Sequence, residues 1–244
     1  MSLTAGIEFL TKNGLNLIAI LDCRAFSPEI AAYFEQDQID LADYRRLVLL
    51  GNGGSDFWRA LKQFGHQTDD PVDYFSRILV NRFVDDYLDS HQMLAKGHKM
   101  LWLYPQTDYL TPLQQLGEIA GWGHPSPIGN SINAQYGLWF AYRAAFLTTA
   151  ELPLRQEPSQ PSPCESCHDK PCISACPAGA VGAIGRFGLN SCIDQRLVDN
   201  STCADRCLAR LACPIAPEHR YPLEQITYHY GRSRDDLAAY RKTP

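Results

Sequence analysis

The stretch from Cys164 to Val181 reads CESCHDKPCISACPAGAV and holds four of the nine cysteines in the chain. Its first three cysteines are spaced C-x2-C-x4-C, and the fourth follows after three intervening residues, directly before a proline. A second group repeats this outline and again ends in Cys-Pro: Cys192, Cys203, Cys207 and Cys213. Clustered cysteines outside a short secreted disulfide scaffold are typical of metal sites.

The spacing is close to that of two-cluster bacterial ferredoxins, in which C-x2-C-x2-C-x3-C-P is used twice and the last cysteine of each run ligates the other cluster. Three closely spaced thiolates can hold three corners of a 4Fe–4S cubane, while the fourth ligand comes from elsewhere in the chain. This rule assigns cluster one to Cys164, Cys167, Cys172 and Cys213. It assigns cluster two to Cys176, Cys192, Cys203 and Cys207.

Two structural zinc sites of four cysteines each are the alternative interpretation. Zinc sites usually show two separated C-x2-C pairs, whereas here only the first pair has that spacing. Small residues also follow the first Cys-Pro, in the run PAGAVGAIG at 177–185. Backbone can pass close to a cluster there, and its N–H groups can donate to cluster sulfurs. The pattern therefore favours iron–sulfur clusters over zinc.

The chain has 244 residues, of which 45% are hydrophobic and 20% are charged, which suits one large domain or two smaller ones. No apolar run approaches the roughly 18 residues of a membrane-spanning helix. The N-terminal segment lacks a basic start and a small-residue cleavage site, so we expect a cytoplasmic protein without a membrane partner. The net charge of −5 argues against binding to DNA.

A proline-rich segment, PLRQEPSQPSP at 153–163, separates two parts of the chain. Four of its eleven residues are proline, which fixes φ and removes hydrogen-bond donors, so we expect an extended connector. The sequence therefore predicts two domains, residues 1–158 and residues 159–244. All eight clustered cysteines lie in the second domain.

The first part alternates short apolar runs with helical patterns. Strands are predicted at 15–21, 47–50, 100–104 and 137–148, the last as a central strand. Helices are predicted at 7–12, 55–64, 70–87 and 111–121, and a C-terminal helix at 222–240. Strands that alternate with helices indicate an α/β layer architecture.

One turn and two single residues in this part stand out. The turn Gly51–Gly54 follows a strand and precedes a helix, so it is either a phosphate cradle or a plain turn. Cys23 follows an apolar strand and is expected to be a buried, inert thiol. Arg143 lies within an apolar strand, and a buried arginine needs a partner. That partner is either a cofactor group or an acid on a neighbouring strand.

The stretch from Gly117 to Cys176 resembles epoxyqueuosine reductase and, more widely, the corrinoid-dependent iron–sulfur reductases that include reductive dehalogenases. The shared order is a helix, the turn Gly121-Trp122, an Asn before the Tyr-Gly-x-Trp-Phe strand at 136–140, a Leu-Pro linker and eight cysteines. The resemblance covers about Tyr74 to Pro214 and is most specific in its cysteines.

The resemblance implies a fold of α+β or α/β class, with a nitroreductase-like domain of the corrinoid-binding type followed by a ferredoxin-like domain with two 4Fe–4S clusters. It implies that a flavodoxin- or ferredoxin-type redox partner supplies electrons, which pass through the clusters to cobalamin for reductive chemistry. His124, in the turn after Gly-Trp, and Arg143 are the candidates for binding the cofactor; the alternative for His124 is a surface residue of the turn.

The family places an acid at the end of the strand before the capped helix. Here that strand ends at Tyr104, and Asp108 follows in a proline-containing loop. A phenol has a reference pKa of about 10 and stays protonated at neutral pH, whereas an exposed carboxyl, at about 3.9, is ionised. We therefore expect Tyr104 to be the proton donor, with Asp108 as the second candidate and His124 as the third.

The chain departs from the family pattern at several places. The Gly-Trp turn continues as Gly123-His124-Pro125-Ser126 in place of Ile-Gly-Lys, and the last Cys-Pro is followed by Ile215 in place of Trp-Asn. We also expect no helical-repeat extension of the kind found in some tRNA-acting members, so the pattern does not favour a tRNA substrate. A second function remains open: a non-catalytic, ferredoxin-like electron-transfer protein whose first domain docks a partner and binds no corrinoid.

Overall fold

The computed structural model describes residues 2–89 and 98–242, and its contacts divide the chain into two compact units. Unit 1 comprises Met1–Trp122 and Phe140–Ser159, and unit 2 comprises Gly123–Trp139 and Gln160–Pro244. The contacts thus place the segment 123–139 with the C-terminal part of the chain. The expected division into domains at 158/159 stays a prediction.

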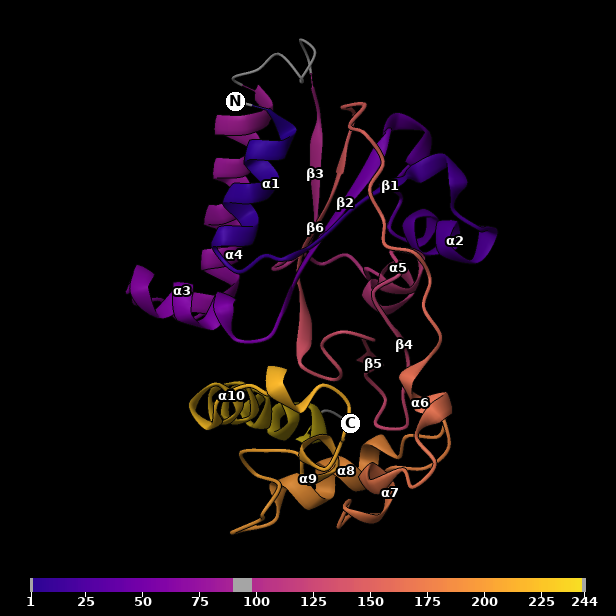
Figure 1. Ribbon diagram of the computed structural model, residues 1–244, viewed down its shortest axis with the longest axis vertical. Coiled ribbons are helices and arrows are strands. Elements are labelled where there is room, and N and C mark those ends of the chain that lie inside the picture. The colour runs from indigo at the N-terminus through magenta and orange to yellow at the C-terminus, as the bar shows by residue number, and fades with distance from the viewer. Residues whose placement is uncertain (1, 90–97, 243–244) are drawn as a thin grey trace. The chain divides into compact units, whose positions relative to one another are not determined.

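Unit 1 is built on a four-stranded sheet with the strand order β1-β2-β6-β3 (Figure 1). Its strands are β1 (Leu17–Asp22), β2 (Arg46–Gly53), β3 (Met100–Tyr104) and β6 (Phe140–Thr148). Its α-helices are α1 (Leu3–Lys12), α2 (Pro28–Gln36), α3 (Asp56–Phe64), α4 (Pro71–Arg82) and α5 (Leu113–Ile119). Three short helices complete it: η1 (Cys23–Ala25), η2 (Leu41–Asp43) and the π-helix η3 (Phe83–Asp89), which continues α4.

Every pair of neighbouring strands in this sheet is antiparallel. Of the two classes that the resemblance implies, α+β and α/β, a sheet with only antiparallel neighbours fits α+β. The expectation of a central strand is confirmed, because β6 pairs with β2 on one side and β3 on the other. It begins at Phe140, three residues later than the sequence predicts.

The core of unit 1 lies on both faces of β2 and β6. Both strands are almost continuously buried, which requires cover on each face of the sheet. Figure 1 shows α1 and α4 side by side at one side of the sheet, with α2 and α5 at the other. The expected helix at 70–87 is found as α4 followed by the π-helix η3, with Pro71 at its start, where a missing N–H costs nothing.

The proline-rich segment is partly attached to unit 1. Arg155 and Ile20 exchange both backbone hydrogen bonds, at 2.7 and 3.0 Å, and Nε of Arg155 donates to the carbonyl oxygen of Ile18. The backbone N–H of Glu157 donates to the carbonyl oxygen of Ala120. These bonds satisfy part of the outer edge of β1, so the first half of the connector completes the sheet and is not a free tether.

Unit 2 contains several short helices, the 20-residue helix α10 and irregular chain, with little sheet. Its elements are β4 (His124–Pro125), β5 (Ser131–Ile132), α6 (Pro163–Ser166), α7 (Pro171–Ser174), α8 (Leu189–Leu197), α9 (Leu208–Leu211), η4 (Pro217–His219) and α10 (Leu223–Lys242). Its main apolar cluster combines side chains from the segment 123–139 with others near the cysteines: Ile128, Ile132, Leu138, Val181, Ala209 and Cys213.

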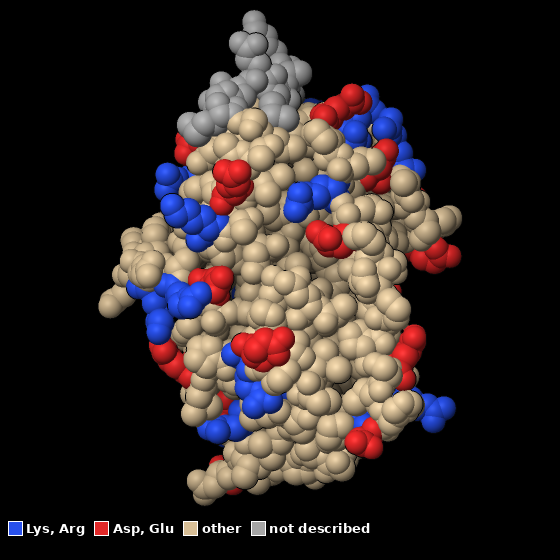
Figure 2. All heavy atoms as spheres, viewed as in Figure 1, with Lys and Arg blue, Asp and Glu red and all other residues tan. Residues whose placement is uncertain are grey.

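Acidic and basic side chains alternate on the face of the molecule seen in Figure 2, with wide uncharged areas between them. Among the described residues, none of the helices combines the length and the hydropathy that crossing a bilayer requires.

Candidate functional site: two groups of four cysteines

The first group of thiols joins α6 and α7 to the end of α9. Burial raises the pKa of Cys164 to about 11, and the neighbouring thiols of Cys213, Cys172 and Cys167 act in the same direction. Cys213 and Cys167 likewise raise the pKa of Cys172, after the larger effect of burial. These four residues are the ones that the Cys-Pro rule assigns to cluster one, so the structure brings them together.

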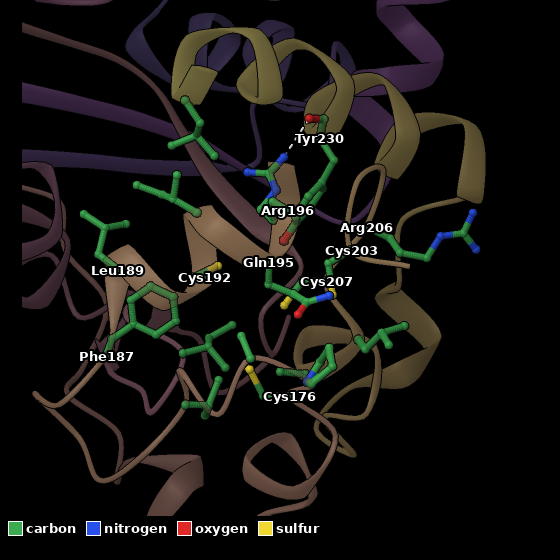
Figure 3. Close-up of a pocket in the computed structure, with 18 of the residues that line it drawn as sticks. Cys176, Phe187, Leu189, Cys192, Gln195, Arg196, Cys203, Arg206, Cys207 and Tyr230 are labelled. Carbon is green, nitrogen blue, oxygen red and sulfur yellow. Dashed lines mark hydrogen bonds between the residues drawn. The ribbon is translucent and has the colours of Figure 1, made fainter. Parts of the chain in front are cut away.

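The second group lies around a cavity of about 190 Å³ in unit 2, shown in Figure 3. Its lining includes the four cysteines that the rule assigns to cluster two: Cys176, Cys192, Cys203 and Cys207. Burial raises the pKa of Cys192, and the thiols of Cys207, Cys176 and Cys203 contribute in the same direction. An engineered cavity of about 150 Å³ holds a benzene molecule, so this cavity has room for a group much larger than water.

All nine cysteines are free thiols. Within the described residues, no group of three or more His, Cys, Asp or Glu side chains is placed so that it could hold a metal ion. Several thiols nevertheless receive backbone hydrogen bonds, as the sulfur ligands of iron–sulfur clusters do. The N–H of Arg210 donates to Sγ of Cys207 at 3.4 Å, that of Ile215 donates to Cys213, and that of Leu208 donates to Cys203.

Arg210 ties the segment 123–139 to the cysteines. Its backbone N–H bonds Cys207, while Nε of its side chain donates to the carbonyl oxygen of Leu138 at 3.1 Å. Its guanidinium lies 4.6 Å from the centre of the Trp139 ring and 5.3 Å from that of Tyr221. One residue therefore positions both a thiol and the chain segment that packs beside it.

Arg143 occupies a bulge in β6, where it has no partner in the ladder with β2. Bulges turn a side chain away from the regular pleat. Here Nε of Arg143 donates to Oδ1 of Asn52 at 2.6 Å, and the guanidinium lies 5.0 Å from the centre of the Phe57 ring. The neighbouring strand thus supplies the partner, but as an amide in place of the expected acid. Asn52 lies in the turn Gly51–Gly54, which proves to be mostly strand.

Tyr104 lies at the end of β3, beside a second irregularity in the pairing with β6. Burial raises the pKa of its phenol, the charge of Arg143 lowers it, and that of Asp73 raises it again. The charge of Arg143 therefore acts on the phenol of Tyr104 within unit 1. Asp108 is exposed in the loop that follows.

The remaining expected residues are distributed over both units. His124, in β4, belongs to unit 2, whereas Arg143 belongs to unit 1, so the two expected cofactor residues lie in different units. Cys23, in η1, is buried, and burial raises the pKa of its thiol to about 12. It stays a protonated thiol at neutral pH, as the sequence predicts.

Two comparisons find nothing: no protein-family model matches the chain, and no curated protein does so. Solved structures do match. An epoxyqueuosine reductase solved with an epoxyqueuosine-modified tRNA-Tyr stem loop has a TM-score of 0.58 and 15% identity, over 92% of this chain and 68% of that one. Epoxyqueuosine reductase from Streptococcus thermophilus has a TM-score of 0.60 and 12% identity, over 90% and 67%.

A catabolic reductive dehalogenase, solved with 3-bromo-4-hydroxybenzoic acid, has a TM-score of 0.58 and 13% identity. The match covers 97% of this chain and 34% of the dehalogenase. Identities this low establish the fold alone. The resemblance predicted from the sequence is confirmed at that level: the chain has the fold of epoxyqueuosine reductases and of a reductive dehalogenase, a fold on which reductases are built.

Proposed function

We propose that the chain is an iron–sulfur oxidoreductase with two 4Fe–4S clusters, which passes electrons to a corrinoid for reductive chemistry. The observation that supports the proposal is that thiols of each expected set act on one another, at Cys164 and at Cys192, and that the second set lines one cavity. Each group takes three cysteines from one sequence run and one from the other, as crossed ligation in a two-cluster ferredoxin requires. A flavodoxin- or ferredoxin-type protein would supply the electrons.

The residues around each group suit a cluster. Thiols must lose their protons to bind metal, and their crowding and burial oppose ionisation unless a cation compensates. Backbone N–H groups of Arg210, Ile215 and Leu208 stabilise the resulting sulfur charge. When bound, the clusters would supply one-electron storage.

Anaerobically purified protein is expected to contain about eight iron and about eight acid-labile sulfide per chain, since eight clustered cysteines can ligate two 4Fe–4S clusters. The measurement is metal analysis together with a sulfide assay. Cys23→Ser is the control, because Cys23 belongs to unit 1 and lies in neither group; its iron content should be unchanged. Two zinc per chain without sulfide would instead support the structural zinc interpretation.

Cys176→Ser should impair cluster two and Cys213→Ser should impair cluster one, although each residue lies in the sequence run of the other cluster. The expectation is motivated by the effect of Cys213 on the pKa of Cys164 and by the effect of Cys176 on the pKa of Cys192. Paramagnetic resonance of the reduced variants identifies the lost signal by comparison with Cys164→Ser and Cys192→Ser. If Cys176→Ser matches Cys164→Ser, ligation is sequential and the crossed assignment is wrong.

The corrinoid part of the proposal is supported by the fold of the solved reductases. Arg143, one of the two residues expected to bind it, is already held by Asn52 and Phe57. We therefore assign the corrinoid no ligand among the described residues. The chain itself would contribute a proton donor, Tyr104, on which the charge of Arg143 acts.

Hydroxocobalamin added anaerobically to the iron-loaded protein should show shifted absorption bands and co-elute with the chain in gel filtration. Binding changes the surroundings of the corrinoid, and free hydroxocobalamin at the same concentration is the reference spectrum. Unshifted bands without co-elution would support the other function, an electron-transfer protein that binds no corrinoid.

Tyr104 is the proposed proton donor, because burial raises the pKa of its phenol and keeps it protonated throughout the neutral range. Once a substrate is identified, Tyr104→Phe should lower kcat by about 10²- to 10⁴-fold, the usual contribution of a general acid. Asp108→Asn, in the exposed loop, should retain activity, and corrinoid binding should be unchanged in both variants. Full activity of Tyr104→Phe would exclude this role and direct the search to Asp108 and His124.

A further inference from the structure

The cavity lined by the cysteines of cluster two also contains a buried arginine (Figure 3). Arg196 follows Cys192 by four residues in α8, so both side chains lie on the same face of that helix. Arg196 is only 8% exposed. Its Nη2 donates to the carbonyl oxygen of Tyr230 at 2.7 Å and contacts Oγ of Ser233 at 3.0 Å, which holds the guanidinium in place.

The hydrogen bonds of Arg196 do not neutralise its charge. Its Nε is buried and has no hydrogen-bond partner, and its guanidinium lies 4.8 Å from the centre of the Tyr230 ring. Among the ion pairs of the described residues, none includes Arg196. A buried charge without an acidic partner is costly. A cubane with four thiolates is anionic, and gains one more negative charge when it is reduced, so it would supply the missing partner.

Arg206 lines the same cavity, but unlike Arg196 it is partly exposed and paired with an acid (Figure 3). Its Nε lies 2.6 Å from Oδ1 of Asp205, and the two side chains are 33% and 38% exposed. Its charge is therefore paired and screened by solvent. The cavity thus contains one arginine whose charge is buried and unpaired and a second whose charge is already compensated.

The cations near cluster one are more exposed. Lys170 opposes the rise in pKa that burial causes at Cys164, and Arg220 does so at Cys213. Lys170 is half-buried and Arg220 is exposed, so water weakens the field of both. The two proposed clusters therefore have different electrostatic surroundings, although each is held by four cysteines.

We propose that Arg196 raises the reduction potential of cluster two above that of cluster one, so that an electron entering either cluster rests on cluster two. The inference rests on the proposed function, because it requires both clusters. One electron is added to the cubane, no bond to the protein breaks, and the electron comes from a low-potential external reductant. A fixed positive charge in a buried site stabilises the added negative charge, and this stabilisation favours the reduced form.

The test is a dithionite titration of the iron-loaded chain, monitored by paramagnetic resonance, for the wild type, Arg196→Met and Arg206→Met. Arg196→Met should shift the reduction equilibrium of cluster two at least tenfold toward the oxidised form, which is 59 mV for one electron. Arg206→Met, the matched control, should shift it less than threefold, and cluster one should be unchanged in both. Arg196→Lys keeps the charge and should shift the equilibrium less than Arg196→Met does.

Equal shifts for Arg196→Met and Arg206→Met would overturn the inference while leaving the proposed function intact, because both clusters would still be present. If iron and sulfide analysis shows that the protein contains no clusters, the proposed function itself is overturned. If Arg196→Met does not assemble cluster two, the inference is tested on the wild-type protein, by assigning its higher-potential signal to one of the two clusters. The signal at higher potential should be the one that Cys192→Ser removes, and its removal by Cys164→Ser instead would refute the inference.

Discussion

The crowding of eight thiols is the constraint on which unit 2 depends. The unit has little sheet, and its main apolar cluster packs directly against the cysteines. Small domains with few buried apolar side chains commonly require metal or disulfide links to fold. No disulfide forms here, and buried neighbouring thiols resist ionisation without a cation. Folding of unit 2 and loading of the proposed clusters are therefore expected to be coupled.

The features that could be predicted from the sequence are those encoded locally. The apolar run at 100–104 predicts β3, the three- and four-residue steps after Pro71 predict α4, and the long run before Thr148 predicts β6. The spacing of the cysteines and the Cys-Pro rule predict two sets of four ligands; the structure places these thiols near one another in unit 2, and the assignment of each to a cluster stays a prediction. These signals survive because each depends on neighbours in the sequence.

The features that could not be predicted depend on distant pairing. Strand direction is set by which strands meet, and the alternation of strands and helices does not specify the antiparallel long-range pairing of β2 with β6. Asn52 looked like part of a glycine turn, yet it bonds Arg143, which lies 91 positions away. Similarly, Arg196 gave no signal in the sequence, because its significance comes from the cavity and from the absence of an acid beside it.

The contacts that join 123–139 to unit 2 also affect how this molecule can be inherited. The chain passes between the units at 122/123, 139/140 and 159/160, so neither unit is a single contiguous piece of sequence. A genetic crossover within the proline-rich segment would transfer the cysteines without Leu138 and Trp139. Arg210 donates a hydrogen bond to the first and stacks on the ring of the second. Such a crossover could also separate Arg155 from its partner Ile20 in β1, or Glu157 from its partner Ala120 at the end of α5. The two units are thus expected to evolve together and to resist exchange by recombination.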